Sequence, residues 1–110
     1  NFSSTDQLQR LKQLLCTDNP VMVRIGNGYL PNGKYIPLLA RFIAHWITVW
    51  GYDDVQEIFY VYDSCIPQKH YNKSIPVGNT TRGYKEMLRD WGAAGLLNPN
   101  LKRYMYIQVN

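Results

Sequence analysis

The first quarter of the chain carries a helical pattern of hydrophobic positions followed by an extended one. In residues 5–16 leucines recur at intervals of three or four, which predicts a helix with one buried face. Ser4 with Gln7 is typical of a capping box at the start of that helix. The Asp-Asn-Pro sequence at 18–20 ends it, because proline disfavours the helical conformation of the residue before it. Residues 21–25 then form a hydrophobic run that predicts a strand.

Two hydrophobic runs in the middle of the chain predict an antiparallel hairpin. Glycine and proline are frequent in residues 26–41, which predicts a loop before the first run. The run at 43–50 alternates only loosely and is apolar on both sides, so we expect a central strand that is buried on both faces. The Gly-Tyr-Asp-Asp sequence at 51–54 predicts a turn, and residues 58–62 form the partner strand.

The last part of the chain predicts a loop, a helix and a closing strand. Residues 64–81 contain prolines and a glycine and predict irregular structure. Thr81 is placed to cap a helix that runs through Trp91, since the hydrophobic positions before Trp91 repeat with helical spacing. Residues 104–109 alternate and predict a strand. The order of elements therefore predicts an α+β fold built on a small antiparallel sheet.

Composition and charge narrow the class of protein. A length of 110 residues allows one domain with one core, and 45% hydrophobic with 18% charged residues is ordinary for a globular protein. The net charge of +4 comes from scattered Lys and Arg, so no nucleic-acid partner is expected. No stretch approaches the ~20 apolar residues of a membrane span. Because the first residue is Asn rather than Met, we expect residues 1–110 to be one domain-sized fragment of a longer protein.

Two polar residues at strand ends are the strongest candidates for chemistry. His45 opens the first strand of the predicted hairpin and Asp63 closes the second, so the hairpin brings their side chains together. A carboxylate bonded to an imidazole fixes the tautomer of the ring and stabilises its charged form, as in a nucleophilic triad. The thiol that completes such a triad must lie within reach of His45. The same spacing suits a histidine held by a carboxylate for structural reasons, and both interpretations stay open.

The sequence around these two residues is similar to that of a known family. Residues 44–54 are AHWITVWGYDD and residues 59–63 are FYVYD. They resemble the signature of papain-like cysteine peptidases of the bacteriocin-processing (double-glycine peptidase-like) family. There a His begins a strand ending in Gly-Tyr-Asp, and the next strand ends in Asp. A helix and a Pro-Val-x-Val-Arg strand before His45, and a helix ending in Trp-Gly after Asp63, agree with that family.

The resemblance implies a fold, a reaction and partners. The fold would be the papain-like cysteine proteinase fold, of which this chain is the C-terminal half, an antiparallel β-sheet with flanking helices. The reaction would be peptide-bond hydrolysis by a Cys-His-Asp triad, with His45 as general base and Asp63 orienting it. The expected partners are a peptide or protein substrate and the missing N-terminal half or another chain, and no cofactor is expected. Related proteins are exported or act at the bacterial envelope.

The chain departs from the family pattern at two places. Ser64-Cys65 follows Asp63 where the family usually has Pro. The nucleophilic Cys of the family, with a Gln shortly before it, has no counterpart, so we expect the nucleophile outside this chain and no peptide hydrolysis by the chain alone. Cys16 ends the first predicted helix, and the position of Cys65 does not suggest attack on a substrate held against His45. We interpret both cysteines as structural or incidental, either free or joined in one disulfide.

Three other interpretations follow from the same residues. A degenerate peptidase-like module would bind an extended peptide without catalysis, in a groove near His45 and Trp46. A papain-fold acyl transferase would use the same triad for amide transfer. A zinc site formed by His45, Asp63, Cys65 and His70 is conceivable, but no metal-ligand spacing supports it, so no metal is predicted.

Overall fold

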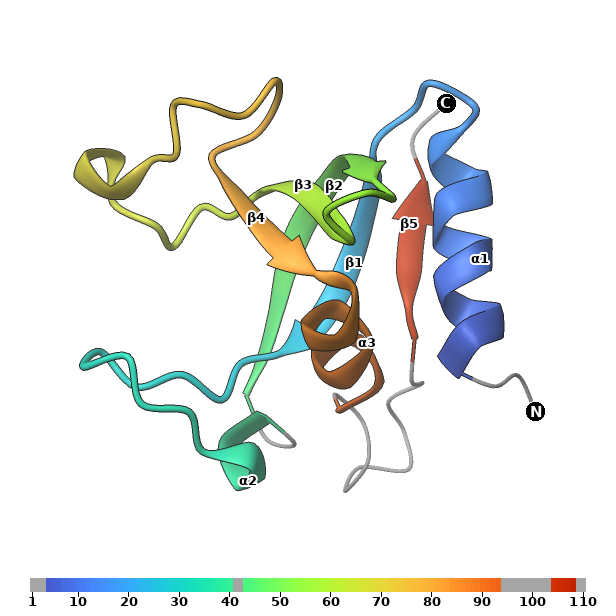
Figure 1. Ribbon diagram of the computed structural model, residues 1–110. Helices are drawn as coiled ribbons and strands as arrows, with labels where there is room; N and C mark the ends of the chain where they lie inside the picture. Colours follow the sequence, from blue (N-terminus) through green and yellow to red (C-terminus); the bar gives the residue numbers. More distant parts are fainter. Residues whose placement is uncertain (1–3, 41–42, 94–103, 109–110) are drawn as a thin grey trace.

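The chain folds into a five-stranded antiparallel sheet with helices on one face. A computed structural model describes residues 4–40, 43–93 and 104–108 (Figure 1). The strand order is β4-β3-β2-β1-β5, which confirms the predicted α+β class and the central place of the second strand. The elements are α1 (Ser4–Leu15), β1 (Val21–Gly26), α2 (Pro37–Ala40), β2 (Ala44–Asp53), β3 (Ile58–Tyr62), the 3-10 helix η1 (Gln68–His70), β4 (Thr80–Gly83), α3 (Tyr84–Ala93) and β5 (Tyr106–Gln108).

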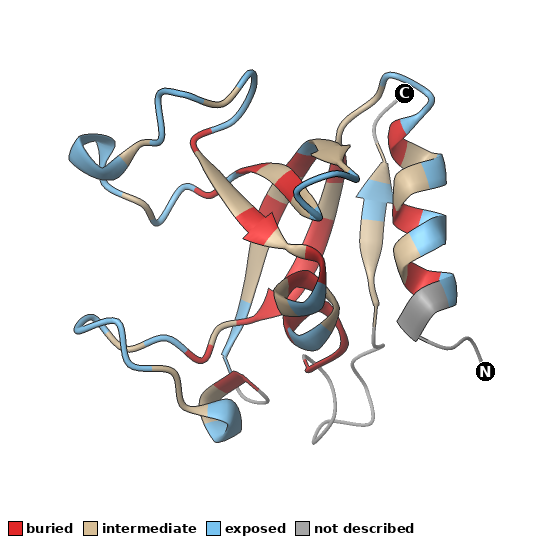
Figure 2. Cartoon of the chain, viewed as in Figure 1, coloured by how far each residue is buried: buried red, intermediate tan, exposed pale blue. Residues whose placement is uncertain are grey.

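One hydrophobic core lies between the sheet and the two longer helices. Leucines of α1 and aromatic residues of α3 contact alternate residues of the central strands, and each such buried side chain contributes about 1.5–3 kcal/mol (Figure 2). Among the described residues no helix has the length and apolar character needed to cross a membrane. The core comprises Leu11, Leu15, Val21, Val23, Ile25, Ile47, Val49, Phe59, Val61, Tyr84, Met87 and Trp91.

The other face of the sheet is open, which corrects the expectation that β2 is buried on both sides. Trp50 is 48% exposed, whereas Val49, its neighbour on β2, is fully buried. Tyr62 of β3 is 42% exposed on the same open face. The helices cover only one face of the sheet, so the alternation along each strand separates a buried row from an aromatic, solvent-exposed row.

The β2–β3 turn lies later in the chain than the sequence predicts. β2 continues through the expected turn to Asp53, with a bulge between Val49 and Gly51, and residues 54–57 make the turn instead. The Asp53 carboxylate accepts the N–H groups of Val55 and Gln56 at 2.8 and 3.2 Å, which is how an aspartate starts a turn. Gly51 and Tyr52 resemble a turn signal in the sequence, but in the structure they pair with Tyr60 and Phe59 of β3.

The segment 80–83 is a strand, not the start of a helix. Thr81, the expected cap, pairs with Tyr60 of β3, and α3 begins only at Tyr84. Pairing satisfies the backbone of β3 along an edge that would otherwise be unpaired. The final strand is also shorter than predicted: Tyr104 has a positive φ of 56°, β5 begins at Tyr106, and position 109 lies outside the described residues.

Two loops project from the same side of the sheet (Figure 1). Residues 27–36 form a small hairpin closed by a bridge between Tyr29 and Tyr35. The Tyr35 hydroxyl donates to Asp90 of α3 at 3.0 Å and the Tyr29 hydroxyl donates to Glu86 at 2.6 Å, so α3 anchors this loop. The second loop, residues 64–79, connects β3 to β4.

Candidate active site

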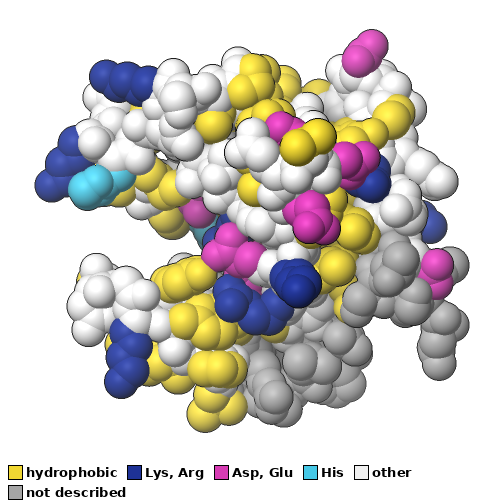
Figure 3. All heavy atoms as spheres, in the orientation of Figure 1, with side chains coloured by type: hydrophobic (Ala, Val, Ile, Leu, Met, Phe, Trp, Pro, Cys, Tyr) yellow, Lys and Arg dark blue, Asp and Glu magenta, His cyan; other side chains and the backbone are white. Residues whose placement is uncertain are grey.

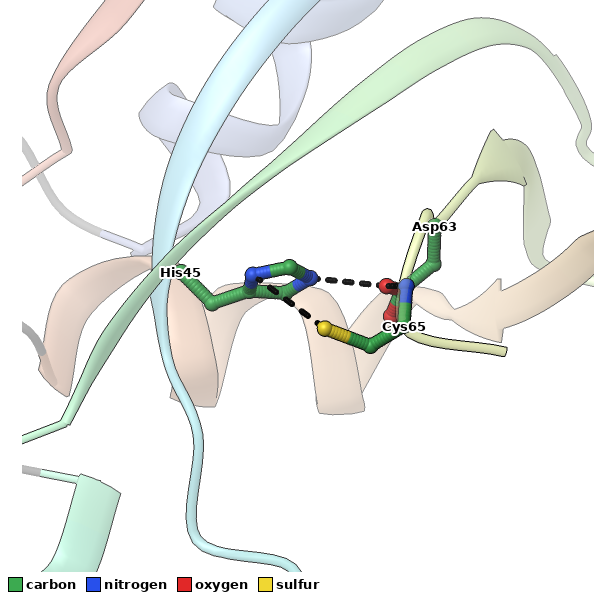
Figure 4. A group of neighbouring side chains, drawn as sticks. All are labelled: His45, Asp63 and Cys65. Atoms are coloured by element: carbon green, nitrogen blue, oxygen red, sulfur yellow. Dashed lines mark hydrogen bonds and ion pairs between the residues drawn. The ribbon is translucent and has the colours of Figure 1, made fainter. Parts of the chain in front are cut away.

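His45 and Asp63 form the hydrogen-bonded pair that the hairpin predicts. His45 is the second residue of β2, and Asp63 directly follows β3. Their contact joins His45 Nε2 and Asp63 Oδ1 at 2.7 Å (Figure 4). The side chains are 18% and 11% exposed, so the pair is shielded from bulk water on most sides but remains reachable.

Hydrogen bonds from Asn79 and Cys65 hold the backbone and the carboxylate of Asp63. Asn79 accepts the Asp63 N–H and donates to the Asp63 carbonyl, both at 2.9 Å, and Asn79 is only 2% exposed. The Asp63 Oδ1 atom also accepts the N–H of Cys65 at 2.9 Å. These bonds fix the carboxylate with respect to the sheet, and through it they orient the imidazole ring of His45.

The bond from Asp63 determines which nitrogen of His45 is available for chemistry. An ionised carboxylate only accepts hydrogen bonds, so Nε2 carries the proton in the neutral ring. Nδ1 is then the nitrogen with a lone pair, and a proton taken up there gives an imidazolium whose charge faces Asp63. The pair can therefore act as a base unit whose reactive atom is Nδ1.

Cys65 lies beside this nitrogen, although its position in the sequence predicts no catalytic role for it. Its Sγ is 3.9 Å from His45 Nδ1, and the residue is exposed. Thr48 pairs with Tyr62 in the β2–β3 ladder, so the same register extended outward by three positions on each strand puts Cys65 opposite His45. The contact between Cys65 and His45 follows from the sequence only when the turn is placed at residues 54–57.

The group of three side chains has the composition of a metal site as well as of a triad. The ligand atoms of His45, Asp63 and Cys65 all lie within 4.8 Å of one another. His70, the fourth residue of the zinc site considered from the sequence, is exposed in η1 and is not in this group. Cys16 is exposed, with its Sγ 3.6 Å from the Tyr52 hydroxyl, and neither cysteine is in a disulfide.

Trp46 lies on the other face of the sheet from His45, because neighbouring residues of a strand point to opposite sides. Trp46 pairs with Arg24 of β1. A role for Trp46 in a substrate groove shared with His45 stays a prediction, and the alternation of β2 does not favour it. The open face carries a shallow groove of about 530 Å³, lined by Thr48, Trp50, Tyr62, Val77 and Gly78.

The surface is hollowed between the two projecting loops. Figure 3 shows a notch between the two projecting loops, with hydrophobic side chains on both sides of it. Residues 27–43 lead into β2 just before His45, and residues 64–79 leave β3 just after Asp63. The pair thus lies where both loops meet the sheet.

Comparison with known proteins gives one match. Residues 1–64, which include His45 and Asp63, match the sequence model of the family described as butirosin biosynthesis protein H, N-terminal. The chain belongs to this family. No curated protein and no solved structure matches the chain. The membership in the double-glycine peptidase-like family and the papain-like fold, both expected from the resemblance, remain predictions.

Proposed function

We propose that the His45–Asp63 pair is the base unit of a Cys-His-Asp acyl-transfer centre of the papain type, with a nucleophilic cysteine supplied from outside this chain. The observation that carries the proposal is the 2.7 Å bond between Asp63 Oδ1 and His45 Nε2, which leaves Nδ1 as the proton acceptor. His45 lies on β2 and Asp63 directly follows β3, and the notch between the loops would give a substrate access (Figure 3).

The chemical steps follow from this geometry. His45 Nδ1 removes the proton of the thiol, and the thiolate attacks an acyl carbonyl. As the acyl–nitrogen bond breaks, the imidazolium returns the proton to the leaving amine, and a thioester to the cysteine remains. Water then attacks the thioester, with His45 again as base, and releases the acid and the free thiol. The net reaction is hydrolysis of a peptide bond. Asp63 stabilises the imidazolium of His45 both when the thioester forms and when it is hydrolysed.

Hydrogen bonding around Cys65 supports a nucleophile from outside the chain. An attacking thiolate needs nearby backbone N–H groups to stabilise the oxyanion that forms. The N–H of Cys65 is taken by the Asp63 carboxylate at 2.9 Å, and the N–H of Ile66 is taken by the Asp63 carbonyl at 3.2 Å. These two N–H groups are therefore engaged elsewhere and do not point at an oxyanion that attack by Cys65 would form.

Transfer of the acyl group to an amine or a hydroxyl is a second candidate, favoured by the family match. The matched family carries the name of a protein of butirosin biosynthesis, and a biosynthetic role suits group transfer better than peptide degradation. The two candidates share the thioester and the base, and they differ only in whether water or another nucleophile accepts the acyl group. Product analysis with added amines distinguishes them.

Alkylation of the full-length protein tests the base unit. A small electrophile at neutral pH should label one cysteine outside residues 1–110 fastest. His45→Ala should slow that labelling at least about tenfold, because the thiolate loses its imidazolium partner. Asp63→Asn should slow it as well, since an amide at this position no longer stabilises the imidazolium. His70→Ala, which alters an exposed histidine in η1, is the matched control and should leave the rate unchanged.

Two outcomes contradict the proposal. If no cysteine depends on His45, the pair is not a base unit, and a peptide-binding module without catalysis becomes the better interpretation. If the His45-dependent thiol is Cys65 itself, the external nucleophile is wrong. Peptide mapping of the labelled residue separates these outcomes.

A further inference from the structure

We propose that His45 and Cys65 bind a borderline-soft divalent cation such as Zn²⁺, and that the bound ion blocks the base unit. The binding is inferred from the side chains alone, whereas the blocking rests on the proposed function. Cys65 Sγ and His45 Nδ1 face each other at 3.9 Å. The other ring nitrogen, Nε2, is hydrogen-bonded to Asp63 (Figure 4).

The spacing of the two ligand atoms fits zinc with little movement. Bonds of about 2.0 Å to nitrogen and 2.3 Å to sulfur at a tetrahedral angle separate the two atoms by about 3.5 Å. The observed 3.9 Å differs from this by a few tenths of an ångström. Cys65 is exposed on the loop after β3, so rotation of its side chain is enough to close the difference.

The surroundings of the ring are those of a metal-bound histidine. A ligating histidine usually donates its second N–H to a carboxylate, which fixes the tautomer and raises the basicity of the ligating nitrogen. Asp63 accepts from Nε2 in this way, and the buried Asn79 holds the backbone of Asp63. The second-shell hydrogen bonds that such a site needs are therefore already formed in this structure.

The ligand types select the class of ion. A thiolate and an imidazole favour Zn²⁺ and softer ions, whereas Mg²⁺ and Ca²⁺ prefer sets of oxygen ligands. Two protein ligands leave coordination positions for water or for the cysteine that we propose comes from outside the chain.

An ion on Nδ1 excludes the proposed proton transfer. The lone pair that accepts the proton of the attacking thiol is the pair that binds the metal, so the nitrogen cannot serve both roles at once. Occupancy of the site should switch the thiol chemistry off, and a chelator should restore it. The proposed ion is thus a reversible inhibitor rather than a cofactor.

Zinc binding to the full-length protein tests the site, measured as competition with a chromogenic chelator. Cys65→Ser should weaken the affinity for Zn²⁺ at least about tenfold, and His45→Ala should weaken it similarly. Asp63→Asn should weaken it about 10- to 100-fold through the loss of the second-shell partner. Cys16→Ser and His70→Ala remove other exposed potential ligands, and they should leave the affinity unchanged.

A second readout keeps the two proposals separate. Co²⁺ bound at the site should show a sulfur-to-metal absorption band that disappears in Cys65→Ser and persists in Cys16→Ser. Equal zinc affinity of the wild type and Cys65→Ser would overturn the metal site, whatever the alkylation result. If zinc binds as expected but His45→Ala leaves every thiol equally reactive, the site stands and the proposed function fails.

Discussion

Asn79 holds the backbone of Asp63 with two hydrogen bonds of 2.9 Å, accepting its N–H and donating to its carbonyl oxygen. The N–H of Asn79 in turn donates to Val61 of β3 at 2.8 Å. The loop between β3 and β4 thereby returns to the sheet beside the residue that orients His45. The position of the carboxylate depends on a residue 16 positions later in the chain as well as on its own strand.

Asn79→Ala should destabilise the fold and loosen the base unit together. It leaves the N–H and the carbonyl of Asp63 without partners in a buried place, which should lower the free energy of unfolding by about 2–4 kcal/mol. Urea denaturation measures this loss, and the His45-dependent alkylation rate should fall even under conditions where the variant is folded. Asn72→Ala is the matched control, because the Asn72 side chain accepts from Ser74 in an exposed part of the same loop. A similar loss of stability in both variants would contradict the assigned role of Asn79.

Gly78 should not tolerate a side chain, for two separable reasons. Its φ is +84°, and a Cβ atom there would lie 2.3 Å from the carbonyl oxygen of Val61. Gly33 has a φ of +86° but no atom within 4 Å of the equivalent Cβ position. Gly33→Ala therefore measures the cost of the left-handed conformation alone, about 1–2 kcal/mol. Gly78→Ala adds the clash with β3 and should cost about 2–5 kcal/mol. Thermal unfolding of the two variants checks the difference, and equal losses would show that the clash is relieved without cost.

The sequence predicted the elements with strong periodicity and the pairing of His45 with Asp63. Residues 5–16 carry the leucine face of α1, and the hydrophobic run at residues 21–25 marks β1. The hairpin topology is enough to bring the ends of β2 and β3 together. The register is not predictable to one residue, because the capping by Asp53 moves the turn beyond the Gly-Tyr pair.

The errors arise where contacts distant in sequence decide the local structure. Thr81 has the local features of a helix cap, but hydrogen bonding to β3 makes it part of a strand. The neighbouring Arg82 binds Asp90 of α3 at 2.7 Å, which further ties this segment to the sheet and the helix. The contact between Cys65 and His45 likewise depends on long-range pairing, because the bulge between Val49 and Gly51 shifts the register of β2 and β3.

Asp90 is fully buried and should be the most sensitive charged residue of the scaffold. It accepts from Arg82 at 2.7 Å, from Arg89 at 2.8 and 3.0 Å, and from the Tyr35 hydroxyl at 3.0 Å. Asp90→Asn leaves two guanidinium groups without their carboxylate, and removing one partner from a buried pair costs about 3–5 kcal/mol.

Urea denaturation measures that loss of stability, and hydrogen exchange measures the local stability of the hairpin at residues 27–36. The N–H of Ile36, which donates to Gly28 in the hairpin anchored by Tyr35, should exchange faster in Asp90→Asn. Glu86→Gln is the control, because Glu86 accepts only an exposed bond among those described, from Tyr29 at 2.6 Å, and it should cost less than about 1 kcal/mol. A change of less than about 1 kcal/mol in Asp90→Asn would show that the two arginines find other partners.

The protein should lose stability in alkaline solution through tyrosines whose hydroxyl groups bind carboxylates. Burial and the bond to Asp54 raise the pKa of Tyr84 above its ordinary value of 10.0. Burial and the bond to Asp90 raise the pKa of Tyr35, and the bond to Glu86 with burial raises that of Tyr29. The folded state therefore retains protons that the unfolded chain releases, so stability is complete below about pH 10 and declines as the pH rises toward the raised pKa values.

Tyr84→Phe isolates one of these groups. Tyr84 is 7% exposed, so its phenol should contribute a slope close to the limit of about 1.4 kcal/mol per pH unit above pH 10. The variant should unfold more easily at neutral pH, because Asp54 loses a hydrogen bond of 2.6 Å, yet its free energy of unfolding should fall less steeply in alkali. Urea denaturation between about pH 8 and pH 11 measures both effects. Parallel curves for the variant and the wild type would mean that Tyr84 ionises in the folded state as readily as in the unfolded chain, and the alkaline sensitivity would then have to come from other groups.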